Sequence, residues 1–325
     1  FSGKILLGMA PSQPNTIYAS IGNGFSNEDG ASWLCRSDDF GSSWTIKNTT
    51  DYSLWQGWFS HDVAVNPNDP DKITVIGINV WNSTNGGTNL IVKTNGGIGY
   101  VNPPIEGPDG MGDFVHSDAH DVVYHPTNEN IIYIASDGGI HRSVDGGNNY
   151  SSCNGRYQTA QFYNGFSTSQ QDPGFCMGGL QDNGTIRWNG DKTWSRVLGG
   201  DGSWSAIHPT NDDEFYVSWQ YLNIIKTETG GDNLFEVEAP KVWPYSFIAP
   251  YAIAPSNGEV VYATSSIIAK STDGASSWVV TNNGSSVASN GTPVLSIAIS
   301  HQNPDVVYAA TAPFSGNPSQ VVRTL

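Results

Sequence analysis

The chain has 325 residues, and its 14 basic and 30 acidic side chains give a formal net charge of −16. This charge argues against nucleic acid and anionic membranes as partners, because both need Lys and Arg to neutralise phosphates. No apolar run approaches the roughly 20 residues of a membrane helix, so we expect no membrane insertion. Only 14% of the residues are charged while Gly, Asn, Ser and Thr are abundant, which favours an extracellular protein.

One unit recurs along the chain. It consists of an apolar strand, a turn that usually contains Pro, a second strand centred in most copies on Tyr, and a polar turn. The middle of the unit appears at 11–20, 66–77, 125–136, 208–219, 254–265 and 300–311. Tyr216, Tyr262 and Tyr308 are spaced by 46 residues, and the segment 162–179 fills the one gap that this spacing leaves. We therefore predict seven units.

Each unit contains four short runs rich in Val, Ile, Tyr and Trp, which we name strands A to D, and no long segment shows helical periodicity. This pattern predicts an all-β fold, namely a seven-bladed β-propeller of four-stranded antiparallel blades. The expected strands A, B and C are 118–124, 131–136 and 140–143 in blade 3; 249–253, 259–265 and 266–271 in blade 6; and 294–299, 305–311 and 319–324 in blade 7. We expect a single propeller domain over 1–325 with an incomplete last blade, within a longer multidomain protein.

A polar turn with the pattern Ser-x-Asp-x-Gly-x-x-aromatic lies between strands C and D. Asp can accept backbone N–H bonds within the turn, Gly permits a positive φ, and the ring can pack between blades. Degraded copies stand at 83–90 and 227–234, and blade 4 has 188–194 instead. Because the motif is degraded in some blades that keep their strands, we interpret the turn as a structural element and not a catalytic one. The residues of the three best copies are Ser37, Asp39, Gly41, Trp44, Ser143, Asp145, Gly147, Tyr150, Ser271, Asp273 and Trp278.

The strand order of a blade brings A-strand starts, B–C turns and D–A linkers to one face, opposite these polar turns. We call it the entry face. His116, Asp118 and His120 alternate along the strand that enters blade 3, so we expect their side chains to point the same way. Two imidazoles and a carboxylate in this pattern could bind a divalent cation such as calcium.

The same strand order places further polar and aromatic residues on the entry face. The candidate ligand-binding residues are Trp55, Trp58, His61, Gln181, Asp182, Asn183 and Asp201. The candidate catalytic carboxylates are Asp118, Asp137, Asp182 and Asp201. Each of these residues also has a structural explanation, because Asp-Gly and Asn-Gly form turns and a single His at a strand entry is commonly a hydrogen-bonded structural residue. The sequence leaves both interpretations open.

Six segments in this order resemble the Asp-box (bacterial neuraminidase repeat) propellers of secreted and surface proteins of Bacteroidota, and more distantly sortilin-type and xyloglucanase-type propellers. The segments are 56–67, 115–126, 136–147, 161–166, 178–188 and 199–209. The resemblance implies a secreted propeller within a larger protein, often one with a sorting domain for type IX secretion. It implies no single activity, because one fold hosts many functions.

Two functions follow from these observations. The first is a non-catalytic binding or structural module of adhesin type, whose partners are a carbohydrate or protein ligand at the cell surface and other domains of the same protein. The alternative is a glycoside hydrolase of xyloglucanase-like type, which needs two carboxylates about 5–5.5 Å apart if retaining or about 6.5–9.5 Å apart if inverting.

Two other enzyme classes fit less well. A sialidase needs an arginine cluster, and three of the six Arg residues lie on strand C beside the polar turns, away from the entry face. A metal-dependent enzyme would need an open coordination position and a neighbouring base, and the sequence shows no further ligand motif. Among the cysteines, Cys153 and Cys176 are candidates for one disulfide, with Cys35 left over.

Overall fold

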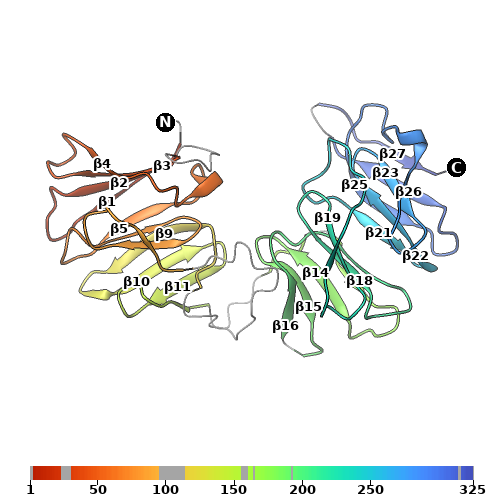
Figure 1. Ribbon diagram of the computed structural model, residues 1–325, viewed down its shortest axis with the longest axis horizontal. Helices are drawn as coiled ribbons and strands as arrows, with labels where there is room; N and C mark the ends of the chain where they lie inside the picture. Colours follow the sequence, from red (N-terminus) through yellow and green to blue (C-terminus); the bar gives the residue numbers. More distant parts are fainter. Residues whose placement is uncertain are drawn as a thin grey trace. The chain divides into compact units, whose positions relative to one another are not determined.

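The computed structural model describes residues 3–22, 31–94, 114–154, 160–163, 165–191, 193–313 and 316–324, without the side chain of Trp55. These residues form seven successive antiparallel sheets (Figure 1). Six sheets have four strands and the last has three, and within each sheet consecutive strands are hydrogen-bonded neighbours. This is the architecture of a seven-bladed β-propeller, as the sequence predicts.

The chain divides into two compact units, which we describe separately. Unit 1 contains blades 1 to 3, and unit 2 contains blades 4 to 7. The strands of unit 1 are β1 (Ile5–Met9), β2 (Ile17–Gly22), β3 (Ser32–Ser37), β4 (Thr45–Asn48), β5 (Asp62–Val65), β6 (Ile73–Ile76), β7 (Val80–Ser83), β8 (Ile91–Val92), β9 (Ala119–His125), β10 (Asn128–Ser136), β11 (Gly139–Ser143) and β12 (Ser151–Ser152), with a short 3-10 helix η1 (Leu54–Gln56) before β5.

The four sheets of unit 2 follow the same order. Their strands are β13 (Ser167–Thr168), β14 (Cys176–Leu180), β15 (Gly184–Trp188), β16 (Trp194–Leu198), β17 (Ser205–Ile207), β18 (Phe215–Trp219), β19 (Asn223–Thr227), β20 (Phe235–Val237), β21 (Tyr251–Ala254), β22 (Asn257–Thr264), β23 (Ile268–Ser271), β24 (Val279–Val280), β25 (Val294–Ile299), β26 (Val307–Thr311) and β27 (Val321–Arg323), with η2 (Asn282–Gly284) before β25. The predicted strand at 294–299 is confirmed residue for residue, and the others quoted for blades 3, 6 and 7 agree within a few residues.

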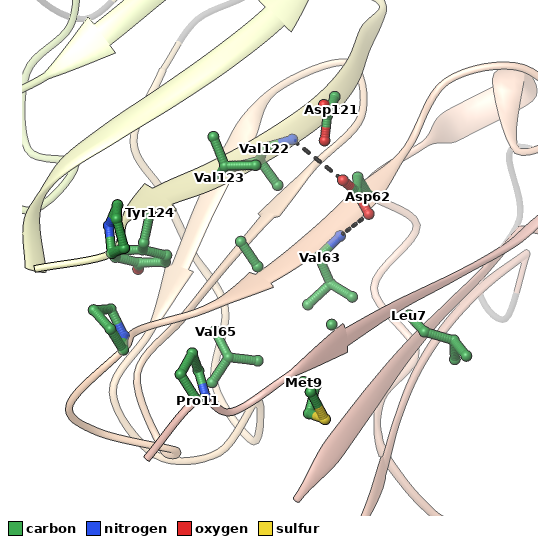
Figure 2. Close-up of a pocket in the computed structure, with 14 residues that line it drawn as sticks. Leu7, Met9, Pro11, Asp62, Val63, Val65, Asp121, Val122, Val123 and Tyr124 are labelled. Carbon is green, nitrogen blue, oxygen red and sulfur yellow. Dashed lines mark hydrogen bonds between the residues drawn. The ribbon is translucent and has the colours of Figure 1, made fainter. Parts of the chain in front are cut away.

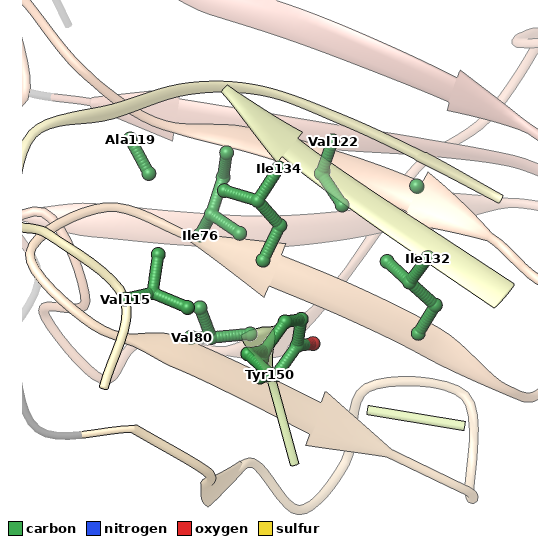
Figure 3. Packing of buried hydrophobic residues seen from close by; sticks show 9 residues of the cluster. Ile76, Val80, Val115, Ala119, Val122, Ile132, Ile134 and Tyr150 are labelled. Atoms are coloured by element: carbon green, nitrogen blue, oxygen red, sulfur yellow. The ribbon is translucent and has the colours of Figure 1, made fainter. Parts of the chain in front are cut away.

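Within each unit, the first strands of consecutive blades pack against one another. In unit 1, β5 contacts both β1 and β9, and in unit 2, β17 contacts β13 and β21 while β21 contacts β25. The core lies between neighbouring sheets, as Figure 3 shows for blades 2 and 3, where Ile76, Val80, Ile132 and Ile134 interdigitate with Tyr150. Fully burying such a side chain contributes about 1.5–3 kcal/mol.

The repeated Tyr of strand B explains part of the sequence period. Tyr18, Tyr216 and Tyr262 are buried in their sheets, and each donates its phenolic hydroxyl to a backbone carbonyl of the next blade. The acceptors are Pro70, Gly274 and Pro304, at 2.8, 2.9 and 3.0 Å. A buried Tyr hydroxyl needs a partner, so the residue fixes the spacing of neighbouring blades.

The polar turns are hydrogen-bonded as the sequence predicts. Asp39 accepts the Ser43 N–H at 2.8 Å and the Ser43 hydroxyl at 2.6 Å, and Asp145 and Asp273 accept equivalent bonds. The Ser43 bonds lower the pKa of Asp39 to about 2. In the degraded copy at 227–234, Thr229 takes the place of Asp and accepts the Asn233 N–H at 2.9 Å. The turn therefore keeps its bonds after Asp is lost, as a scaffold element should.

Two details of the sequence prediction are wrong. The ring of Trp44 is 44% exposed and does not pack between blades, whereas Tyr150 does. Cys35, Cys153 and Cys176 are free, so the suggested Cys153–Cys176 disulfide is not formed. Across the described ranges, no helix is long and apolar enough to cross a membrane.

Candidate functional site on the entry face

The strand order brings the expected residues of blade 3 together. His120 lies near the start of β9 and Asp137 lies in the β10–β11 turn, and the His120 Nε2 is 2.6 Å from Asp137 Oδ1. The Asp137 N–H also donates to the Asp118 carbonyl at 3.3 Å. Each side chain of the His120–Asp137 pair is about 30% exposed, so the pair lies at the surface of the entry face.

The predicted arrangement of His116, Asp118 and His120 is wrong in one respect. Strand β9 begins only at Ala119, and Asp118 has a left-handed φ of 63°. A left-handed residue interrupts the alternation of side chains along a strand, so the three do not form a row. Instead the His116 Nδ1 lies 2.9 Å from the Ser117 carbonyl. A cation site made of these three residues stays a prediction.

Asp118 is a buried carboxylate of unit 1. It is only 8% exposed, and its Oδ1 has no hydrogen-bond partner among the described residues. Burial raises its pKa, the nearby Asp137 raises it further, and a hydrogen bond from the Gln56 side chain partly opposes this. A carboxylate oxygen of Asp118 lies within 4.8 Å of one of Asp137. Two carboxylates this close can share a proton or a cation.

His61 is buried and does not reach the surface. Its Nδ1 lies 2.7 Å from the Ser20 hydroxyl, which also contacts the Tyr52 hydroxyl at 2.8 Å. Burial and the nearby Lys4 lower the pKa of His61 to about 4, so the ring is neutral at pH 7. We therefore correct the prediction that His61 faces a ligand: it is a structural residue between blades 1 and 2.

Trp58 supplies an exposed ring near the acidic pair. Its side chain is 50% exposed and its ring lies 5.1 Å from that of Phe59. Phe59 in turn contacts the His120 ring edge-on at 4.7 Å. That Trp58 contacts a ligand stays a prediction, and the side chain of Trp55 lies outside the described part of the chain.

In unit 2, Asp201 joins two turns of the entry face. Its Oδ1 accepts the Asp182 N–H at 3.0 Å, and its Oδ2 accepts the Gln220 side-chain amide at 2.7 Å. Burial, followed by the negative charges of Asp201 and Asp182, raises the pKa of Tyr163 to about 12. Asp201 therefore braces the turn of blade 4 and the turn of blade 5.

Gln181 and Asn183 belong to the same turn as Asp182. The Gln181 N–H donates to the Gln161 carbonyl at 3.0 Å, and the Asn183 amide donates to the Gln181 carbonyl at 3.1 Å. These bonds hold the backbone of the turn. That residues of blades 3 and 4 share one rim stays a prediction.

The sequence analysis missed a second acidic pair, Asp62 and Asp121. It opens on a pocket of about 360 Å³ between β1, β5 and β9, whose other walls are apolar (Figure 2). Asp62 accepts the Val63 and Val122 N–H groups at 2.8 and 3.2 Å. Burial outweighs these bonds and, together with Asp121, raises the pKa of Asp62 to about 6. The sequence does mark this pair, because the triplet His-Asp-Val occurs at both 61–63 and 120–122 and places Asp62 and Asp121 at equivalent positions of two blades.

Gln56 and Gln220 were also missed, because their role depends on contacts with carboxylates distant in the sequence. Both bind candidate carboxylates: Gln56 binds Asp118, and Gln220 binds Asp201.

Comparison with known proteins shows only distant likeness. No family model and no curated relative match the chain. Similar solved structures include a GH74 enzyme of Niastella koreensis (TM-score 0.35, 14% identity, 97% of this chain and 64% of that one), YCF48 of Cyanidioschyzon merolae (0.35, 13%, 98% and 94%) and a GH74 xyloglucanase of Xanthomonas campestris (0.36, 15%, 98% and 52%). The chain thus spans less than two thirds of either GH74 protein, and the propeller assignment rests on the sheets described above.

Proposed function

We propose that the protein is an extracellular propeller module that binds a ligand on its entry face and does not catalyse a reaction there. One observation carries this proposal: two of the four candidate catalytic carboxylates of that face, Asp137 and Asp201, are engaged in contacts that hold loops. Asp137 pairs with His120, and Asp201 accepts a backbone N–H and a side-chain amide from two different turns. A carboxylate committed in this way positions a surface and has little freedom to exchange protons with a substrate.

Composition supports the extracellular setting. The chain has few charged residues and many Gly, Asn, Ser and Thr, and its charge of −16 disfavours phosphate-bearing partners. The ligand is therefore a carbohydrate or a protein at a cell surface, and we expect further domains of the same protein to act beside it.

The test is to run two assays on the same samples. Soluble xyloglucan, xylan and mannan are incubated with the protein, and both retardation in native gels containing each polysaccharide and released reducing ends are measured. The proposal predicts no release above the buffer control. Release that is lost in Asp137→Asn but kept in Asp232→Asn, an exposed acid away from the entry face, would show an enzyme.

A glycoside hydrolase is the second candidate, and the Asp118–Asp137 pair favours it. Their oxygens lie within 4.8 Å, near the separation of about 5–5.5 Å between the carboxyl groups of retaining enzymes. The pKa of Asp118 is raised, as the acid of such a pair requires, and the Asp137 carboxylate lies 2.6 Å from His120 Nε2. Loss of sugar release in both Asp118→Asn and Asp137→Asn would establish this function.

A further inference from the structure

Four aromatic side chains of unit 2 gather on the entry face without serving the core. Tyr221 lies in the β18–β19 turn, and Trp243, Tyr245 and Phe247 lie in the linker between β20 and β21. Tyr221 contacts Tyr245 and Phe247 at ring distances of 5.9 and 5.2 Å, and Trp243 contacts Tyr245 at 5.3 Å. We call these four residues the aromatic platform. Trp243 is 68% exposed and Tyr221 is 45% exposed.

The platform is fixed before any ligand arrives. The Tyr221 N–H donates to the Phe247 carbonyl at 2.9 Å, which ties the turn to the linker. Lys241 Nζ donates to the Tyr221 carbonyl and to Asn223 Oδ1, both at 3.0 Å, and lies 5.7 Å from the centre of the Tyr245 ring. A binding surface that is already ordered loses less entropy when it binds.

The β18–β19 turn has bulky residues at positions where Gly or Asn is usual. In the three-residue turn between Trp219 and Asn223, Tyr221 and Leu222 have left-handed φ values of 63° and 62°, a conformation that favours Gly and Asn. Leu222 is buried in the core of unit 2, so the packing of its side chain explains why it adopts a left-handed φ. Tyr221 is exposed and gains no such packing, although a bulky residue is strained at positive φ. A strained, exposed ring points to a binding role.

Hydrogen-bonding groups surround the rings, which decides between ligand classes. The phenol hydroxyls of Tyr221 and Tyr245 and the ammonium of Lys241 belong to the platform or touch it, and Gln220 beside Tyr221 bonds to Asp201. A protein partner or a second copy of the chain needs a broad, largely continuous surface of at least about 1,200 Å² in total. A pyranose instead has one apolar C–H face that stacks on an aromatic ring and hydroxyls at its edge that seek such polar groups.

We propose that the aromatic platform is a stacking site for the pyranose rings of a neutral glycan. This inference rests on the proposed binding function and names its ligand class. The charge of −16 disfavours acidic sugars at the same surface. Binding at this site needs no catalytic acid or base, because ring stacking and hydrogen bonds to the sugar hydroxyls suffice.

The experiment measures affinity for cellohexaose, xylohexaose and mannohexaose by isothermal titration calorimetry. We expect the native chain to bind at least one of them, and Trp243→Ala to weaken that affinity at least tenfold. Trp243→Phe, which keeps a ring, should lose threefold or less. The matched control is Trp44→Ala, which removes an exposed Trp from the polar turn of blade 1 and should bind as the native chain does.

Tyr221→Gly keeps the test interpretable if folding is in question. It relieves the left-handed strain, so its melting temperature should equal or exceed that of the native chain while its glycan affinity falls at least fivefold. Unchanged affinity in both Trp243→Ala and Tyr221→Gly, or no binding of any of the three sugars by the native chain, would overturn the inference. Neither result would refute the proposed binding function, because a protein ligand would remain; the non-catalytic part of that proposal is tested separately by sugar release in the assay above.

Discussion

The entry faces of the two units differ in the residues they carry and in how far those residues are buried. In unit 1 the buried acid Asp118 lies at this face and the structural imidazole of His61 lies beneath it, while in unit 2 the face holds the exposed rings of Tyr221 and Trp243. Buried polar groups affect the free energy of unfolding and its dependence on pH. Exposed rings affect stability little and remain available to a ligand. The comparison separates residues that maintain the face from residues that use it.

The largest expected effect lies inside one turn. Leu222→Ala should lower the free energy of unfolding by about 2–5 kcal/mol, because it opens a cavity among the buried side chains of unit 2. Trp243→Ala, on the exposed side of the same platform, should change it by about 0.5 kcal/mol or less. Urea unfolding of the two variants checks this. Equal losses would mean that the platform is part of the core.

Asp201→Ala should lower the free energy of unfolding by about 1–3 kcal/mol. It leaves the Asp182 N–H and the Gln220 amide without their acceptor. Asp232→Ala, which removes an exposed acid, is the control and should stay within about 0.5 kcal/mol. A loss no larger than that of the control would show that Asp201 does not brace the two turns.

The Asp62–Asp121 pair should make unit 1 respond to pH. The pKa of Asp62 is raised from 3.8 to about 6, so the folded state holds this proton more tightly than the unfolded chain. Stability from this group is present below pH 3.8 and is lost as the pH rises to about 6. Two pKa units correspond to about 3 kcal/mol, which partial solvent screening reduces to about 1–2 kcal/mol.

Asp62→Asn should remove this loss, which unfolding measured at pH 4 and pH 7 would reveal. The variant should gain stability relative to the native chain at pH 7. An identical pH dependence in the two proteins would contradict the assigned shift.

The smallest effect concerns strain. Tyr221→Gly should raise the free energy of unfolding by about 1 kcal/mol. The substitution relieves the strain of a left-handed bulky residue, which is about 1–3 kcal/mol, but Gly also increases the entropy of the unfolded chain, which offsets part of this gain. Thermal unfolding measures it. A clear loss of stability would mean that the Tyr221 ring supports the fold.

The blades were predictable because their signal is periodic. Tyr216 and Tyr262 recur at a fixed spacing, and each carries the same hydrogen bond to the next blade. The face on which each turn lies follows from strand order, so the contact of His120 with Asp137 was also within reach.

The geometry of single side chains was not predictable in the same way. A left-handed φ at Asp118 leaves no mark in the sequence, yet it breaks the expected row of ligands. The burial of His61 depends on Ser20, 41 residues earlier. Tyr221 and Trp243 were not predicted because both fall outside the six segments that carry the resemblance, although the aromatic residues at 243–247 are visible in the sequence.

The central claim is that a ligand is held by the exposed rings of unit 2 while the carboxylates of the entry face hold its loops. Hydrogen exchange with and without cellohexaose, xylohexaose or mannohexaose, whichever binds, tests it most directly. The account predicts slower amide exchange confined to the turn at 219–223 and the linker at 241–247. Protection centred on the polar turns or on β1, β5 and β9, with none at those two segments, would contradict it.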